Sequence, residues 1–167
     1  MRIKISADST CDLSPELIET YNIGITPLYI EKGGQNCRDG MDITPQEIFD
    51  YVRSGKGVCR TAAVNVGDYT AFFKKCRENY DAVIHFNISS DFSSCYQNAC
   101  TAAAEFENVY VVDSRNLSTG IALLVLDAAE RAEKGGDPKE IAALMRETAK
   151  KVEASFVIDT LFYLQKG

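Results

Sequence analysis

Short apolar runs and longer helical patterns alternate along the chain. The short runs are rich in β-branched residues, as buried strands are, and they fall at residues 3–7, 23–30, 82–88, 109–112 and 156–158. Between them, apolar residues recur every three or four positions, as they do on the inner face of a helix. This alternation predicts an α/β fold: a mostly parallel sheet flanked by helices on both faces.

Capping signals locate the starts of several expected helices. Ser14 before Pro15 is a favourable start, and Thr44 with Glu47 forms a capping box ahead of a helix whose inner face includes Phe49. We expect helices at about residues 14–21, 44–53, 65–80, 117–134 and 137–152, one that continues through residue 105, and a short helix at 159–164.

A serine-rich loop follows the most apolar of these runs. Residues 82–88 are strand-like, residues after 94 are compatible with a helix, and the loop between them holds Ser89, Ser90, Ser93 and Ser94. Hydroxyls and free backbone amides at a helix N-terminus form a natural site for a carboxylate or phosphate. The same serines are equally suited to capping the helix, and one role does not exclude the other.

Three polar loops follow strand-like runs, at residues 8–10, 89–94 and 113–115. In a parallel sheet these loops open on the same edge, because all the strands end there. Ligands of α/β proteins bind outside the carboxyl ends of the strands. The pattern therefore predicts a binding site built from these loops.

Length and charge narrow the classes of partner. The 167 residues suit one domain, and the net charge of −6 comes without a basic cluster, so we expect no nucleic-acid partner. The N-terminus lacks the apolar core of a signal peptide, which predicts a cytoplasmic protein. Since no apolar run approaches the ~20 residues of a membrane span, we expect no stable membrane insertion.

Cysteine and histidine usage argues against a metal site. The six cysteines include no CxxC pair, and without a secretory signal free thiols are the expected state. The single histidine, His85, lies inside an apolar run and is interpreted as a core or sheet-edge histidine rather than a ligand or a base. We predict no bound metal and no cofactor.

Catalytic signatures are missing. The chain has no GxSxG elbow, no GxxxxGK[ST] loop and no GxGxxG after a strand. Asp8 and Asp12 are candidates for acid–base or metal chemistry, although Asp12 also suits a helix cap. The residues favour binding over catalysis; the alternative is an enzyme that acts on a small phosphorylated or carboxylated metabolite through Asp8 and the serine loop.

Motifs spread over nearly the whole chain resemble those of the DegV family. They are Asp8-Ser9-Thr10-Cys11-Asp12-Leu13, Thr26-Pro27-Leu28, Arg38-Asp39-Gly40-Met41-Asp42-Ile43-Thr44, Thr61, Gly67-Asp68-Tyr69, Ile88-Ser89-Ser90-Asp91-Phe92-Ser93 with Tyr96-Gln97, Val112-Asp113-Ser114, Gly120, and Phe156-Val157-Ile158-Asp159-Thr160-Leu161 with Tyr163-Leu164. Each motif alone is weak, and their shared order makes the set specific.

The resemblance implies a lipid carrier rather than an enzyme. A long-chain fatty acid would lie in an apolar tunnel, with its carboxylate at Thr61 and Ser93 and with Ser9, Ser90 and Ser114 on nearby loops. Some family members deliver the fatty acid to a separate kinase subunit, which would make such a subunit a candidate partner.

The chain departs from the family pattern at three places. Ala62 follows Thr61 where the family has serine, and Val64-Asn65-Val66 replaces a Pro-Ser-Pro segment. Ser94 stands where the family keeps a glycine, which places a Cβ near the expected head group.

The third departure concerns length. Family members have a second lobe, so we expect residues 1–155 to form the first lobe and residues 156–167 to begin a truncated second one. With the tunnel left open on that side, this chain by itself should bind long-chain fatty acids weakly; tight, stoichiometric binding in calorimetry would contradict this expectation.

Overall fold

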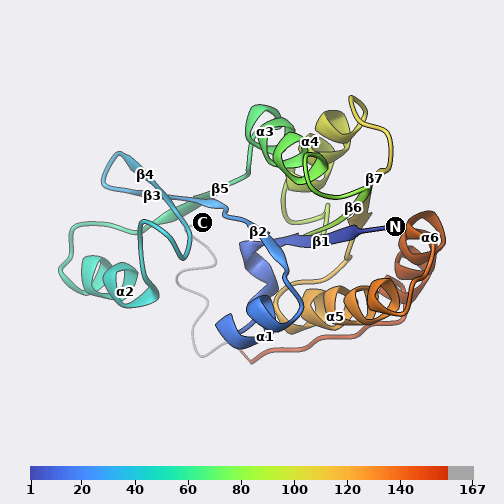
Figure 1. The fold of residues 1–167 in the computed structure, drawn as a ribbon. Helices are drawn as coiled ribbons and strands as arrows, with labels where there is room; N and C mark the ends of the chain where they lie inside the picture. The colour runs from blue at the N-terminus through green and yellow to red at the C-terminus, as the bar shows by residue number, and fades with distance from the viewer. Residues whose placement is uncertain (158–167) are drawn as a thin grey trace. The chain divides into compact units, whose positions relative to one another are not determined.

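The computed structural model describes residues 1–157, which form two compact units (Figure 1). Unit 1 consists of Met1–Thr26 and Val64–Ala154, and unit 2 of Pro27–Ala63 with residues 155–157. The predicted division between residues 1–155 and 156–167 is a different one, and it stays a prediction.

A four-stranded parallel sheet is the centre of unit 1. Its strands are β1 (Ile3–Asp8), β2 (Gly24–Thr26), β6 (Ala82–Asn87) and β7 (Val109–Asp113), in the order β2-β1-β6-β7. Every pair in this sheet is parallel. All six residues of β6 are buried, because the strand is central and is covered on both faces.

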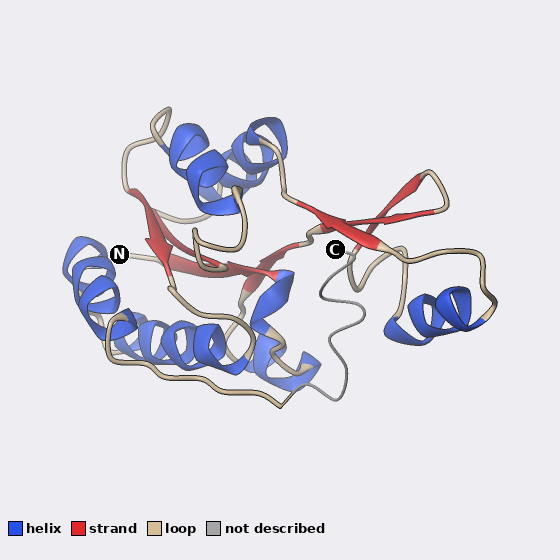
Figure 2. Cartoon of the chain, turned by 180° about the vertical axis from the view of Figure 1, so that it is seen from behind, coloured by secondary structure: helices blue, strands red, loops and turns tan. Residues whose placement is uncertain are grey.

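Helices cover both faces of this sheet, as Figures 1 and 2 show. The helices α3 (Val66–Arg77) and α4 (Cys95–Ala103) lie on one face, and α5 (Thr119–Glu133) and α6 (Pro138–Ala149) lie on the other. A 3-10 turn, η1 (Ser9–Cys11), and the short helix α1 (Pro15–Thr20) follow β1. The predicted α/β architecture with a mostly parallel sheet is confirmed.

Unit 2 contains a small antiparallel sheet that the sequence pattern did not predict. Its strands are β3 (Tyr29–Lys32), β4 (Gln35–Arg38) and β5 (Arg60–Ala62), in the order β4-β3-β5, and it also holds the helix α2 (Pro45–Arg53). The glycines Gly33 and Gly34 join β3 to β4 with φ of 59° and 82°, which matches a two-residue hairpin turn.

The prediction of a single strand at residues 23–30 is therefore wrong. The run is divided into β2 and β3 at Pro27, which has no amide hydrogen to donate to a sheet. The first half pairs in parallel with β1 and the second half pairs antiparallel with β4 and β5. Apolar periodicity cannot show such a change of partner, because it describes one segment at a time and both halves carry apolar residues.

Two further expectations differ from the structure. Phe49, predicted on an inner helix face, is 56% exposed on α2. Phe156 and Val157, predicted in a strand, belong to no strand and are 66% and 100% exposed, since β propensity does not form a strand unless another strand pairs with it. The rest of that strand and the helix expected at 159–164 lie outside the described residues.

The first prediction concerns Gly120, the second residue of α5. A Cβ there would lie 2.5 Å from Asn116 Oδ1 and 2.8 Å from Asn116 Cβ. The Asn116 side chain is held in place, because its amide donates to the carbonyls of Ser114 and Val152. We expect Gly120→Ala to lower the free energy of unfolding by about 1–3 kcal/mol in urea titrations.

Gly67 provides a matched control, because it is the second residue of α3. A Cβ there would meet only the Asn65 Oδ1 atom, at 3.2 Å. Gly67→Ala should leave stability unchanged or raise it by up to about 1 kcal/mol through helix propensity. Equal effects of the two substitutions would contradict the packing argument.

Candidate functional site

The loops that follow β1, β6 and β7 meet at the carboxyl edge of the main sheet. The Ile88 amide donates to Asp8 Oδ2 over 2.8 Å, and the Ser89 amide donates to the Asn116 carbonyl over 3.0 Å. The Ser118 amide closes the ring with a 3.0 Å bond to the Thr10 carbonyl. The predicted convergence of the three polar loops is confirmed.

Asp113, the last residue of β7, and Arg115 of the following loop contact the serine loop, residues 89–94. Ser90 Oγ donates to Asp113 Oδ2 over 2.6 Å, and its amide donates to Asp113 Oδ1. Arg115 pairs with Asp91 at 2.8 Å and with Asp113 at 3.7 Å. The serine loop is therefore preorganised before any ligand arrives.

Ser93 lies immediately before the N-terminus of α4. Its Oγ accepts from the Cys95 amide over 3.2 Å, and its own amide donates to the Ser89 carbonyl over 3.2 Å. The hydroxyl oxygen thus caps α4 as an acceptor, which leaves its proton to donate elsewhere. The first-turn amides of Tyr96 and Gln97 have no acceptor within the helix, so the positive end of α4 lies beside this hydroxyl.

Ser94 adopts a conformation that does not require glycine. It is the N-cap of α4, with φ −76° and ψ 1°, and it is exposed. Its side chain makes no capping hydrogen bond, because Ser93 provides one instead. A serine here causes no backbone strain, so its effect is limited to the space that its side chain occupies.

Of the remaining residues predicted to bind the ligand, Ser9 and Ser114 belong to unit 1 and Thr61 belongs to unit 2. Ser9 begins η1 and is half-buried, and Ser114 is fully buried. The Ser114 hydroxyl donates to the Asn116 carbonyl and accepts from the Asn116 amide, so it shapes its own loop. Thr61 belongs to unit 2, where it is exposed on β5 opposite Ile30 of β3. The ligand-binding roles of these residues stay a prediction.

Asp8 is buried beside the serine loop. Its carboxylate is inaccessible to solvent and accepts from the amides of Ile88 and Thr10, from the Thr10 hydroxyl and, at 3.4 Å, from Asn87 Nδ2. Burial raises the pKa of Asp8, and these donated hydrogen bonds oppose the shift. A carboxylate enclosed in this way joins the ends of β1 and β6 and is shielded from solvent.

A chain of buried polar groups continues from Asp8 into the core. Asn87 Nδ2 donates to the Tyr69 hydroxyl over 2.8 Å and lies 3.3 Å from His85 Nε2, while Ser6 Oγ lies 2.9 Å from His85 Nδ1. His85 also packs edge-on against Tyr69 and Phe73. Of the two predicted positions, core or sheet edge, His85 occupies the core, because it is fully buried on the inner strand β6. Sequence reasoning missed Asn87 and Tyr69, although their polar side chains within apolar patterns were the available signal.

Two cavities of unit 1 lie away from the serine loop. One, of about 300 Å³, is lined by residues of α5, α6 and the turn between them, including Arg131 and Leu144. The other, of about 230 Å³, is lined by residues including Arg2, Tyr21 and Tyr80. The acyl tunnel implied by the resemblance stays a prediction.

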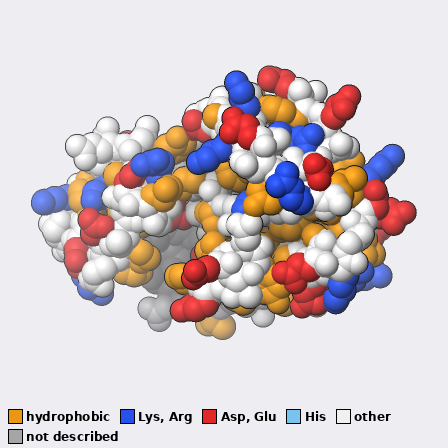
Figure 3. Space-filling model, viewed as in Figure 1, with side chains coloured by type: hydrophobic (Ala, Val, Ile, Leu, Met, Phe, Trp, Pro, Cys, Tyr) orange, Lys and Arg blue, Asp and Glu red, His pale blue; other side chains and the backbone are white. Residues whose placement is uncertain are grey.

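The described residues contain neither a disulfide bond nor a metal-binding cluster. All six cysteines are free, as predicted, and no group of three or more His, Cys, Asp or Glu side chains in residues 1–157 is arranged to hold a metal ion. On the face shown in Figure 3, acidic and basic side chains are intermixed. Within the described part of the chain, no helix has the length and apolarity needed to traverse a bilayer.

Comparison with known proteins identifies the family. Residues 2–167 match the profile of a family described as "uncharacterised protein, DegV family". The chain belongs to the DegV family. A DegV domain-containing protein of Caldanaerobacter subterraneus subsp. tengcongensis is 34% identical over 168 residues, which cover 99% of this chain and 60% of that protein.

Two solved DegV structures share the fold. A fatty-acid-binding DegV family protein from Thermus thermophilus is 33% identical with a TM-score of 0.89, and DegV of Bacillus subtilis, described as a fatty acid binding protein, is 27% identical with a TM-score of 0.92. Each comparison covers 100% of this chain and 60% of the other. This chain therefore spans about 60% of the length of these relatives.

The second prediction uses the burial of His85. Burial lowers its pKa to about 3 from an ordinary 6.5, so the unfolded chain binds the extra proton first as pH falls. The stability contributed by the neutral imidazole is complete above pH 6.5 and is lost as pH falls toward 3. We expect this group to remove about 1.5 kcal/mol of stability between pH 6.5 and 5.

Because His85 is the only histidine, its ring protons give a direct measurement by NMR. Their chemical shifts should stay constant from pH 7.5 to 5 in the folded protein and should titrate near 6.5 in urea. His85→Gln should remove the corresponding part of the pH dependence of unfolding. A folded-state titration midpoint near 6.5 would show the interpretation to be wrong.

Proposed function

We propose that this chain binds a long-chain fatty acid, with the carboxylate held at the N-terminus of α4. The observation that carries the proposal is the position of Ser93: its oxygen caps the helix, its proton is available, and the first-turn amides lie beside it. A carboxylate accepting from these donors gains charge-assisted hydrogen bonds and the favourable helix dipole. The fatty-acid-binding relatives support the choice of a carboxylate over a phosphate.

The resemblance to the DegV family also predicts a contact from the Thr61 hydroxyl, and that contact stays a prediction because Thr61 belongs to unit 2. It lies in the middle of β5, where strand pairing with β3 defines its backbone. Ser9, Ser90, Ser94 and Ser114 then form the surroundings of the head group rather than its direct partners. This assignment agrees with Ser90 and Ser114 already being hydrogen-bonded within the loops.

Most of the affinity would come from the acyl chain. Burying each methylene contributes about 0.8 kcal/mol, so a long chain needs only one polar end to orient it. The serine loop would serve that orienting purpose, since its hydrogen bonds are made before binding. No cofactor is required for binding of this kind.

We propose further that the protein is a carrier and not an enzyme. In this proposal a separate fatty acid kinase subunit acts on the bound carboxylate. The enzyme considered as the alternative would need Asp8 to reach a metabolite. The inaccessible Asp8 carboxylate, surrounded by hydrogen-bond donors, supports the carrier instead.

The third prediction tests the ligand class. Native mass spectrometry of the purified 167-residue chain, followed by extraction, should find a copurified fatty acid or show binding of added oleic acid. A bound nucleotide, metal or phosphorylated metabolite, with no affinity for oleic acid, would contradict the proposed function and favour an enzyme.

The fourth prediction tests the site. Ser93→Ala should weaken binding of the fluorescent fatty acid cis-parinaric acid about 10-fold, because a hydrogen bond to a charged group is lost. Ser14→Ala is the matched control, since Ser14 Oγ caps α1 by accepting from the Leu17 amide. The control should lower stability by about 1 kcal/mol and leave binding unchanged. Equal losses of affinity would place the carboxylate elsewhere.

A further inference from the structure

We propose that Asp8 is a positioning residue for the fatty-acid carboxylate: through the Ile88 amide it fixes the serine loop so that Ser93 presents its hydroxyl to the ligand. This inference rests on the proposed function and adds to it a residue that never touches the ligand. Three observations carry it: the contacts of Asp8, the path from Ile88 to Ser93, and the kind of acceptor that the contacts require.

The contacts of Asp8 join the ends of two neighbouring strands. Asp8 is the last residue of β1, and Oδ2 accepts from the Ile88 amide, the first amide after β6, over 2.8 Å. Oδ1 accepts from the amide and the hydroxyl of Thr10 in η1. One buried side chain thus determines where the β1 loop and the serine loop leave the sheet.

The path from Ile88 to Ser93 is short and hydrogen-bonded. The carbonyl of Ser89, the next residue, accepts from the amides of Phe92 and Ser93 over 2.9 and 3.2 Å. Ser89 Oγ also accepts from the Asp91 amide over 3.2 Å. A displacement of Ile88 would therefore move this turn as a body and carry Ser93 away from the first turn of α4.

The hydrogen bonds around Asp8 require a side chain that accepts at both of its polar atoms, as a carboxylate does. Every polar group that contacts Asp8 is a donor, whereas an asparagine would turn its own N–H groups toward the donors of Ile88 or Thr10. Among the described residues, no lysine or arginine forms a salt bridge with Asp8. Its negative charge opposes a nearby anion, so its benefit to the site is the geometry that it imposes.

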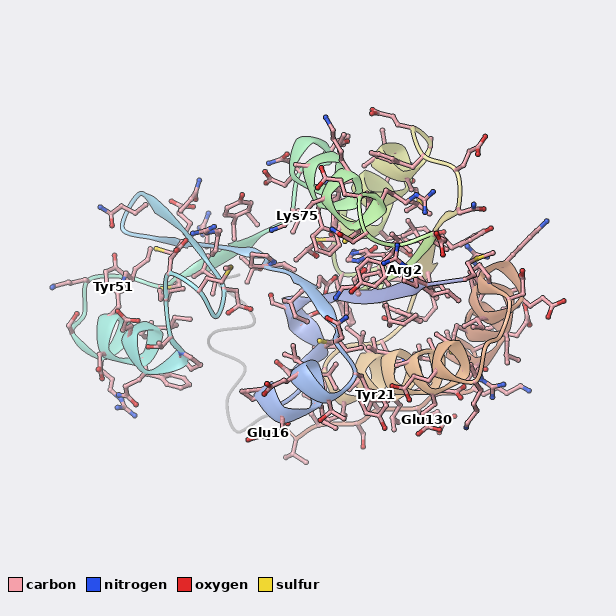
Figure 4. The ribbon with its side chains drawn as sticks, viewed as in Figure 1. Arg2, Glu16, Tyr21, Tyr51, Lys75 and Glu130 are labelled. Carbon is pink, nitrogen blue, oxygen red and sulfur yellow. The ribbon has the colours of Figure 1, made fainter. Side chains whose placement is uncertain are left out.

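The test compares Asp8→Asn with Asp81→Asn in the 167-residue chain. Asp81 Oδ2 accepts from the Arg2 amide over 2.6 Å, so it joins the starts of β6 and β1 as Asp8 joins their ends. Arg2 directly precedes β1 and is labelled in Figure 4. Both variants lose a carboxylate that holds the same two strands, and only one of them lies at the serine loop.

The expected result is a loss of affinity that depends on Ser93. Asp8→Asn should weaken binding of cis-parinaric acid about 5-fold, while Asp81→Asn should stay within about 2-fold of the wild type. Combined with Ser93→Ala, which alone weakens binding about 10-fold, Asp8→Asn should add less than about 2-fold. Independent effects would multiply to about 50-fold.

A spectroscopic measurement separates positioning from a general loss of stability. Oleic acid labelled with ¹³C at its carboxyl carbon should give a bound resonance that shifts in Asp8→Asn in the same direction as in Ser93→Ala. Asp81→Asn should leave this resonance unchanged, even if its unfolding midpoint falls. If Asp8→Asn does not fold, Thr10→Val, which removes one donor to Asp8, should give a smaller shift in the same direction.

The experiments distinguish failure of the proposed function from failure of the inference about Asp8. If the wild-type chain binds neither probe, the proposed function is wrong and this inference is wrong with it. If the wild type binds and Ser93→Ala weakens binding, the proposed function stands and the inference is tested by itself. It is overturned if Asp8→Asn binds with wild-type affinity, or if the losses multiply in the double variant. It is also overturned if the carboxyl resonance does not move in Asp8→Asn, or in Thr10→Val where that variant is used instead.

Discussion

Parallel pairing of β6 with β1 on one side and β7 on the other is the constraint on which the site depends. Because the three strands run in the same direction, residues 8–10, 88–94 and 113–118 leave the sheet at one edge. The registers Ala7 with Phe86 and Asn87 with Asp113 bring the loop starts within hydrogen-bonding reach. An antiparallel β6 would send its serine loop to the opposite edge.

The polar residues at this edge divide into those whose polar atoms are all committed to the loops and those, such as Ser93 and Ser89, whose hydroxyl oxygen serves as an acceptor. Asp8, Asp113 and Ser114 have their polar atoms committed to neighbouring backbone or side chains. Ser93 uses its oxygen on α4 and keeps its proton. This division agrees with a binding protein, because a preorganised loop loses little conformational entropy when a ligand arrives.

Much of the fold could be predicted from the sequence, and the errors have a common cause. The strands of the main sheet and the capped helices followed from periodicity and capping residues, which are local properties. The division of residues 23–30 at Pro27 and the exposure of Phe49 did not follow. Both depend on which distant segment lies alongside, and a local pattern contains no record of that partner.

By itself, the sequence determined the α/β class, the family and the three polar loops, because apolar periodicity, turn residues and ordered motifs are visible one segment at a time. Only the tertiary structure decided that the Asp8 carboxylate accepts from the Ile88 amide and that Asn87 and Tyr69 extend this network into the core. Asp8 and Ile88 are 80 positions apart, and nothing local to either shows that they meet. Burial and hydrogen-bond partners are set when the strands pair, so the roles of these side chains appear only in the folded protein.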